Sequence, residues 1–567
     1  MNRILNTLRG LSVALLAAVV LTSFTPGVFA DSRPDLIIAV NKLPRALEPA
    51  RKTGNVDVRV TYSIFDTLIR RDFASEEPGG GAKLVPHLAE SWKRVDPKTL
   101  VVKLRKGVRF HNGDELTSDD IAFTFSPERM TGKNPTILNG KRYFGHLAKV
   151  VAVDKYTVRF VAKKPDIILE QRLASYASWI VSKRSWIEAA KKGKKAKKKK
   201  KKKPAAGAMA AKKKKKKKKK KKYGGPKWMR VALKYLMRHP VGTGPLKFVE
   251  WKVGDYQKFV AFDDYWGGKP PFKSVTFKLV PEVSTRIAGL VNGEFDIIVN
   301  VPPDQLQVLE RYKEKITVRS IVLNNSHVLV YNTKHPVLKD KRIRQALSLA
   351  INRPVLITAL WQDRAYTPNG HQLKEFGPMY DPARKPPAYD PDKARALLKA
   401  AGYKGESILY RAMADYYVHE RAVAQIIQQM WKKVGVTVEL EVVESFKQKR
   451  KKDVGVYSWS NTYRLPDPTG AILILWGPRS SIQKKYKFWK APKEFNDLDR
   501  QIWGSGDMKE RARKFKRLLD IFEEETPMTI LYNPFETYAM RKGIEWNPYP
   551  LYFMDLRNYN LKIAKKK

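Results

Sequence analysis

Along most of the chain, short runs of alternating hydrophobic and polar residues are separated by turns rich in glycine and proline. Residues 246–251 and 275–280 alternate in this way, which is typical of strands with one buried face. A short helix is expected at residues 284–290, and Gly293 ends it before an apolar run at residues 295–299. This succession predicts strands and helices that fold together in one α/β unit.

The same two patterns continue on both sides of this stretch. Further strands are expected at residues 36–40, 100–104, 317–322, 327–331, 436–443 and 527–532. Further helices are expected at residues 339–351, 390–398, 425–433, 498–515 and 518–525. Asp390 is suited to cap its helix, with Pro391 at the first helical position and Gly402 beyond the end. The chain as a whole is therefore predicted to be α/β.

Composition narrows the class of protein. At 567 residues the chain is long enough for two or three domains, and its 43% hydrophobic and 11% aromatic residues are typical of a folded protein. The sequence has no cysteine, which excludes disulfide bonds, a thiol nucleophile, a thiolate metal site and a cysteine-linked lipid anchor.

The first thirty residues have the pattern of a signal peptide. Arg3 and Arg9 precede an apolar run at residues 11–21, and residues 28–30 offer a cleavage site with small residues. The apolar run is too short to span a bilayer comfortably. We therefore expect an exported protein without a lipid anchor, located in a bacterial periplasm.

Residues 191–222 contain 22 lysines and no acidic residue. Such a segment repels itself and cannot bury apolar area, so a disordered loop is predicted. It is either a tolerated insertion or a tether to anionic surface polymers; no nucleic-acid binding is expected, because no base-reading module is present. Subtracting these 22 charges from the net +56 leaves +34, so the rest of the chain is basic too.

The sequence contains few of the motifs that indicate an enzyme or a metal site. No Gly-x-Ser-x-Gly elbow follows a strand, HExxH is absent, and the eight histidines show no i, i+4 pair. His111, alone in a strand–turn region, is interpreted as structural. We expect no catalysis, no cofactor and no protein-held metal.

Several ordered motifs carry a family resemblance. Residues 84–92 read LVPHLAESW, residues 104–113 read LRKGVRFHNG, and residues 389–398 read YDPDKARALL. Residues 240–251 read PVGTGPLKFVEW, and YWGGKP follows at residues 265–270. Together they resemble the peptide/nickel class of ABC-transporter solute-binding proteins, family 5, whose members include dipeptide- and oligopeptide-binding proteins. The resemblance spans nearly the whole chain after residue 30, except the lysine-rich segment.

The resemblance implies a two-lobed periplasmic-binding-protein fold, class II-like, with an extra N-terminal subdomain and a two-crossing hinge near residues 315 and 527. After a signal peptide at residues 1–30, the implied boundaries are 31–60, 171–315 and 528–567 for the first lobe, 61–170 for the extra subdomain and 316–527 for the second lobe.

It also implies a ligand site around residues 457–468. Peptide-binding members have an aspartate three residues after the tryptophan, which holds the peptide's α-ammonium group. Here that place is Thr462, and the aspartate is missing or displaced to Asp467. Arg464 adds a cation suited to a carboxylate or phosphate. The predicted ligand-binding residues are Tyr457, Trp459, Thr462, Arg464 and Asp467, with Asn41 and Phe65 from the facing lobe.

The function implied is capture of a peptide or related small solute between the lobes and its delivery to an ABC permease with its ATPase subunits. An opine- or sugar-acid-type anion is the alternative solute. A polycationic adhesin that binds anionic surface polymers through residues 191–222 is a second alternative. We expect a monomer.

Overall fold

The computed structural model describes residues 31–73, 81–202, 224–414 and 416–564. The chain divides into two units, residues 1–34 and 35–567, and the fold below is that of the second. The predicted signal peptide and residues 203–222 of the lysine-rich segment lie outside the described residues. Within the described ranges, no helix has both the length and the apolar character needed to cross a bilayer.

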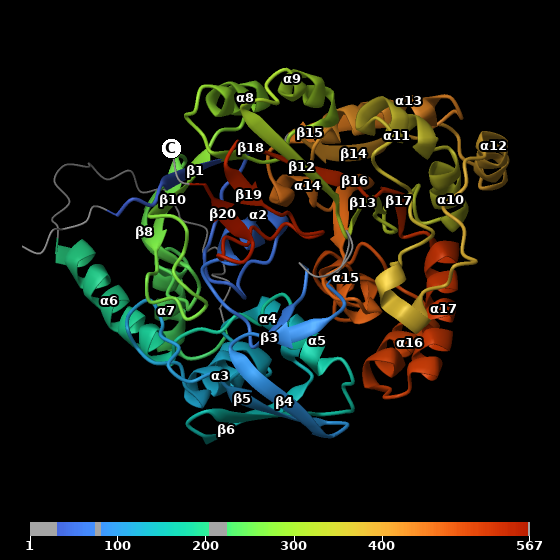
Figure 1. The fold of residues 1–567 in the computed structure, drawn as a ribbon. Coiled ribbons are helices and arrows are strands. Elements are labelled where there is room, and N and C mark those ends of the chain that lie inside the picture. The colour runs from blue at the N-terminus through green and yellow to red at the C-terminus, as the bar shows by residue number, and fades with distance from the viewer. Residues whose placement is uncertain (1–30, 74–80, 203–223, 415, 565–567) are drawn as a thin grey trace, which may run out of the picture. The chain divides into compact units, whose positions relative to one another are not determined.

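A seven-stranded sheet gathers strands from distant parts of the chain (Figure 1). In order across the sheet, its strands are β12 (Ile316–Val322), β18 (Phe535–Arg541), β11 (Ile297–Ile298), β1 (Asp35–Val40), β10 (Ser274–Leu279), β9 (Tyr256–Ala261) and β8 (Leu246–Lys252). β1 runs parallel to β10 and β11, and the other pairs are antiparallel. β1 is central and mostly buried, which explains its nearly continuous apolar sequence.

A second sheet has five strands. In order they are β15 (Val438–Val443), β14 (Ile408–Met413), β16 (Val456–Thr462), β13 (Asn325–Tyr331) and β17 (Met528–Tyr532). β14 is parallel to β15 and β16, whereas β13 is antiparallel to β16 and β17. All seven residues of β13, the neighbour of β16, are buried.

The chain passes between these two sheets twice, at places that differ from the expected hinge. β12 still belongs to the first sheet and β13 to the second, so the first passage lies at residues 323–324 and not near 315. β17 belongs to the second sheet and β18 to the first, which puts the return at residues 533–534 and not at 527. The sequence pattern predicts that β12 and β17 are strands, but it does not determine which sheet each strand joins.

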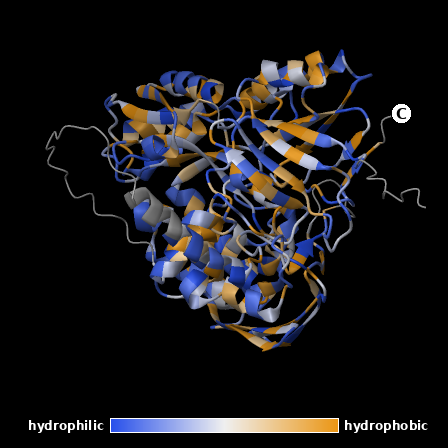
Figure 2. Ribbon diagram, turned by 90° about the vertical axis from the view of Figure 1, so that its left-hand side faces the viewer, coloured by the Kyte–Doolittle hydropathy of each residue, from blue (hydrophilic) through white to orange (hydrophobic). Residues whose placement is uncertain are grey.

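A third, antiparallel sheet lies within the predicted extra subdomain. Its strands are, in order, β4 (Ala89–Asp96), β5 (Thr99–Leu104), β7 (Thr157–Ala162) and β6 (Leu147–Asp154). Leu100, Val102 and Leu104 are buried while the residues between them are not, as the alternation predicts. Figure 2 shows the matching change between orange and blue along such strands. Two-stranded pairs join β2 (Ile69–Arg71) to β3 (Leu84–Pro86) and β19 (Ile544–Trp546) to β20 (Leu561–Ile563).

Helices connect the strands throughout. In the first part of the chain they are α2 (Asn55–Thr61), α3 (Ser118–Thr124), α4 (Leu138–Phe144), α5 (Leu169–Leu173), α6 (Lys183–Lys202), α7 (Lys227–Leu236), α8 (Val283–Val291) and α9 (Leu306–Glu310). Between the passages they are α10 (Lys341–Leu349), α11 (Arg353–Trp361), α12 (Pro391–Ala400), α13 (Glu420–Lys432), α14 (Phe446–Lys449), α15 (Ile472–Trp476), α16 (Lys493–Gly504) and α17 (Met508–Glu525).

Local signals in the sequence place the start of α12 correctly. Asp390 accepts a hydrogen bond from the Lys393 amide and Pro391 is the first helical residue, as predicted. Gly402 follows the helix with φ +71°, a conformation that glycine adopts at little cost. The break between α16 and α17 lies at residues 505–507, about ten residues earlier than predicted, because Asp507 caps α17.

The first part of the lysine-rich segment is helical, contrary to the predicted loop. Residues 191–202 continue α6, which Trp186 anchors in the core beside Phe123 and Arg129. α6 packs closely on α7, since a Cβ at Gly193 would lie 2.7 Å from Val231 Cγ1. An anchored helix is readily extended by lysines because their helix propensity is high.

Candidate functional site

A cavity of about 210 Å³ is lined by residues from two parts of the chain, the part before the first passage and the part between the two passages. From the part before the first passage come residues 53–55 at the start of α2, together with Arg142 and Tyr143 on α4. From the part between the passages come β16, the segment after it, α14 and α15. Three of the predicted residues line this cavity: Trp459, Thr462 and Arg464.

Trp459 contributes an aromatic wall from β16. The Arg450 guanidinium lies 4.9 Å from its ring centroid, and the Trp476 ring lies 6.2 Å away. Tyr457, two residues earlier on the same strand, is fully buried and does not line the cavity. Its ring lies 5.5 Å from the Arg450 guanidinium, so Tyr457 contacts a residue that does line the cavity.

Thr462 connects the two sides of the cavity. Its hydroxyl oxygen lies 3.3 Å from Asn55 Oδ1 of α2 and 3.2 Å from Asn325 Oδ1 of β13. One hydroxyl proton can serve only one of these acceptors fully at a time. The position that the resemblance assigned to an ammonium-binding acid is therefore occupied by a neutral link between the two parts of the chain.

Arg464 lines the cavity immediately beyond β16. Its Nη1 donates to the Thr462 carbonyl at 3.3 Å, and its guanidinium lies 5.3 Å from the Tyr176 ring centroid. The Ser175 hydroxyl holds this segment by donating to the Arg464 carbonyl at 2.7 Å. The side chain is thus held at the cavity wall.

Asp467 lies outside the cavity lining and has another task. Its carboxylate is buried, forms an ion pair with Arg511 of α17, and accepts from the Thr469 amide at 2.8 Å. The turn that Pro466 and Pro468 enclose directs it toward α17. The hypothesis that Asp467 replaces the missing ammonium partner finds no support in this geometry.

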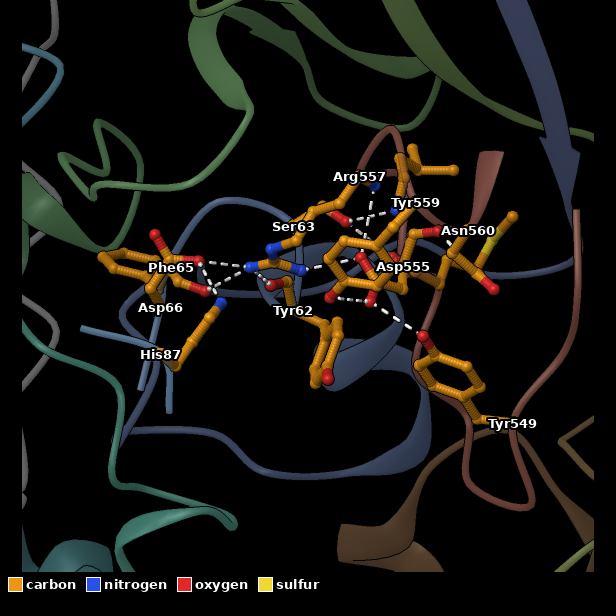
Figure 3. Close-up of polar contacts among 12 residues, drawn as sticks. Tyr62, Ser63, Phe65, Asp66, His87, Tyr549, Asp555, Arg557, Tyr559 and Asn560 are labelled. Carbon is orange, nitrogen blue, oxygen red and sulfur yellow. Dashed lines mark hydrogen bonds and ion pairs between the residues drawn. The ribbon is translucent and has the colours of Figure 1, made fainter. Parts of the chain in front are cut away.

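Asn41 and Phe65 also lie away from this cavity. Asn41 lines a separate space of about 20 Å³, which shares Asn55, Tyr416 and Tyr417 with the larger cavity. Phe65 is buried in the core, and its carbonyl accepts from Arg557 Nη2 at 3.2 Å (Figure 3). The sequence pattern around an apolar residue such as Phe65 is the same whether its side chain lines a binding site or packs in the core, so the pattern does not distinguish the two roles.

Sequence reasoning missed the rest of the cavity lining, including its two other arginines, Arg142 and Arg450. Arg142 lies in a short helix that carries no motif, and Arg450 lies in the run KQKRKKD, which resembles any solvated basic surface. Neither position carries a signal that spacing or composition could have separated from the background of 111 lysines and arginines.

His111 is structural, as predicted. Its Nε2 lies 2.8 Å from the Gly244 carbonyl, and its Nδ1 accepts from the Gly242 amide at 3.2 Å. Burial lowers the pKa of His111 to about 4, so the ring is neutral at pH 7. In the part of the chain that the structure describes, no group of three or more His, Cys, Asp or Glu residues is placed to hold a metal ion.

The family model described as bacterial extracellular solute-binding proteins, family 5 Middle, matches residues 83–482. The chain is 27% identical to the dipeptide-binding protein of Escherichia coli K12 over 495 residues, which cover 82% of this chain and 84% of the relative.

Two solved structures share the fold. One is the periplasmic binding protein DppA from Helicobacter pylori in complex with the peptide STSA, with a TM-score of 0.75 and 22% identity, covering 94% of this chain and 99% of the other. The second is the binding protein AgaA from A. tumefaciens R10 in complex with agropinic acid, with a TM-score of 0.75, 21% identity and the same coverage. Since the family model matches more than half of the chain, this chain belongs to family 5 of the bacterial extracellular solute-binding proteins.

Proposed function

We propose that this chain is the periplasmic receptor of an ABC importer, which captures a peptide or related small solute and delivers it to the membrane permease. Its family membership supports the receptor role, and the names of its relatives support the solute class. Export by the signal peptide at residues 1–30, a monomeric state and the absence of catalysis are parts of the same proposal.

One observation carries the proposal. The cavity is lined both by α2 and α4 and by β16, which are separated in the chain by the passage at residues 323–324. A solute in it would contact both parts at once. Such a solute favours the closed arrangement over an open one, because only the closed arrangement offers it both sets of contacts.

Trp459→Ala tests the site. We expect the affinity for the solute to fall roughly tenfold or more, because a large aromatic wall that excludes water is lost. The measurement is calorimetric titration with the solute that mass spectrometry identifies in denatured, natively purified protein. Trp251→Ala is the matched control, since Trp251 is also half-buried but lies on β8, outside the cavity. Equal affinity in both variants would remove the site assignment.

The opine-type alternative keeps the same fold and role with an anionic solute. AgaA, whose structure holds agropinic acid, has this fold. The charge of the cavity bears on the choice between the two classes of solute.

A further inference from the structure

Three arginines line the cavity without a carboxylate beside them. They are Arg142 on α4, Arg450 after α14 and Arg464 after β16, and among the residues that the structure describes no aspartate or glutamate lines the same space. Within the described ranges, none of the three forms an ion pair. Like charges that share an enclosed site repel one another, and a bound anion relieves that repulsion.

Aromatic rings hold two of these guanidiniums without neutralising them. Arg450 lies 4.9 Å from the Trp459 ring centroid and 5.5 Å from that of Tyr486. Arg464 lies over Tyr176. The Nε atoms of Arg450 and Arg464 are buried and have no hydrogen-bond partner among the described residues. Donors fixed in place but unsatisfied are what a carboxylate or phosphate requires.

The pKa of Arg142 agrees with this crowding. Burial lowers it most, and the nearby charges of Arg464 and Arg450 lower it further, whereas Tyr143 and Tyr486 act in the raising direction. An anion in the cavity would act in the opposite direction.

We propose that the solute is a small molecule with at least two anionic oxygen groups, held by Arg142, Arg450 and Arg464. This deepens the proposed function and rests on it. The complementary consequence concerns the ammonium group: a free ammonium group on the solute would find no carboxylate among the described residues of the cavity lining, and Asp467, which lies outside that lining, is paired with Arg511.

A basic groove of about 550 Å³ adjoins the cavity and shares Arg142 with it. Its lining includes Lys141, Lys163, Lys164 and Lys484, and none of these four forms an ion pair with a described residue. Asp166, the one acid among the described residues of this lining, is paired with Arg172 and His146. Positive potential along an approach raises the association rate of anions, and added salt screens it.

The test is calorimetric titration of the full mature protein, freed of solute by unfolding and refolding, with four probes that are each built on a dipeptide. They are Ala-Ala-amide, Ala-Ala, N-acetyl-Ala-Ala and N-acetyl-Glu-Glu, which carry progressively more negative charge. We expect affinity to rise along this series, with N-acetyl-Glu-Glu binding roughly tenfold or more tighter than N-acetyl-Ala-Ala. Glucose 6-phosphate, run in parallel, distinguishes phosphate from carboxylate as the preferred group.

Arg464→Gln should weaken the binding of N-acetyl-Glu-Glu roughly tenfold or more. Raising the salt concentration should slow the association of N-acetyl-Glu-Glu with the unaltered protein. Arg395→Gln is the control, because Arg395 lies on the exposed side of α12 and is paired with Asp392. If Arg464→Gln melts far below the unaltered protein, Arg142→Gln replaces it in the same titration.

Two results would overturn the inference. One is that acetylation of Ala-Ala weakens binding, which would reveal an ammonium site. The other is that neither N-acetyl-Glu-Glu nor glucose 6-phosphate binds while mass spectrometry finds a neutral or cationic molecule on natively purified protein; the receptor function would then still stand. No bound molecule and no binding of any probe would overturn both proposals.

Discussion

Arg557 holds two buried carboxylates together near the end of the chain. It forms ion pairs with Asp66 and Asp555, and Tyr549 and Tyr559 donate to Asp555 at 2.9 and 2.7 Å (Figure 3). The two ion pairs lower the pKa of both aspartates against the opposing effect of burial. The cluster therefore joins a turn of the first hundred residues to the C-terminal segment.

Arg557→Met should destabilise the protein by about 3–5 kcal/mol, because it leaves two buried carboxylates without their cation. Urea unfolding followed by circular dichroism measures the loss. Arg395→Met, an exposed site, should change the free energy of unfolding by less than about 1 kcal/mol. Equal effects at the two sites would contradict the assigned role of Arg557.

Asp499 is a buried acid whose pKa is raised, in contrast to those of Asp66 and Asp555. Burial raises its pKa to about 7 and Arg479, 3.5 Å away, lowers it only in part. Because the folded-state pKa lies above the unfolded value, the folded protein binds more protons between these values, and this group's contribution to stability falls as pH rises toward 7.

Asp499→Asn should remove that dependence. We expect the variant to exceed the unaltered protein in unfolding free energy by about 2 kcal/mol at pH 8 and to match it near pH 4. Urea titrations at both pH values measure the difference. A constant difference across this range would show that Asp499 is not the titrating group.

At the scale of secondary-structure elements, the turn at residues 240–245 depends on the close approach of its backbone to the backbone at Ile64. A Cβ at Gly242 would lie 2.0 Å from the Ile64 carbonyl oxygen, and the Gly242 carbonyl accepts from the His111 amide at 2.9 Å. The motif GTGP is thus required because the backbone of one segment packs directly on that of another.

Gly242→Ala should lower the free energy of unfolding by about 1–3 kcal/mol, the usual cost of overpacking, since a backbone oxygen cannot move aside as a flexible side chain can. Gly506→Ala is the control, because its new Cβ would have ordinary contacts beyond 3.6 Å. Differential scanning calorimetry compares them; similar melting temperatures would refute the explanation.

For the molecule as a whole, the lysine-rich segment and the solute cavity are treated by two different proposals. The described residues that line the cavity lie between 53 and 481, and none of them belongs to residues 191–194 at the start of the segment. The adhesin alternative assigns function to the segment, whereas the receptor proposal assigns it to the cavity.

Replacing residues 203–222 by a Gly/Ser linker of equal length should leave solute affinity within about twofold and reduce salt-sensitive binding to anionic vesicles. Calorimetry and vesicle co-sedimentation measure the two properties, with the unaltered protein as reference. Loss of solute affinity would contradict the independence of cavity and segment.

The sequence by itself determined the local features and the family: the strands, the Asp390 cap, the structural role of His111 and the motifs that identify family 5. These depend on neighbours in the chain, so spacing and residue type carry them. It also predicted Trp459, Thr462 and Arg464, which line the cavity.

Only the tertiary structure decided which sheet β12 and β17 join, that Asp467 faces Arg511, and that Arg142 meets Arg450 and Arg464 across more than 300 residues of chain. Each of these depends on contacts between distant segments. Since an arginine has the same chemistry on a solvated surface and in a cavity, only its surroundings in the folded protein distinguish the two.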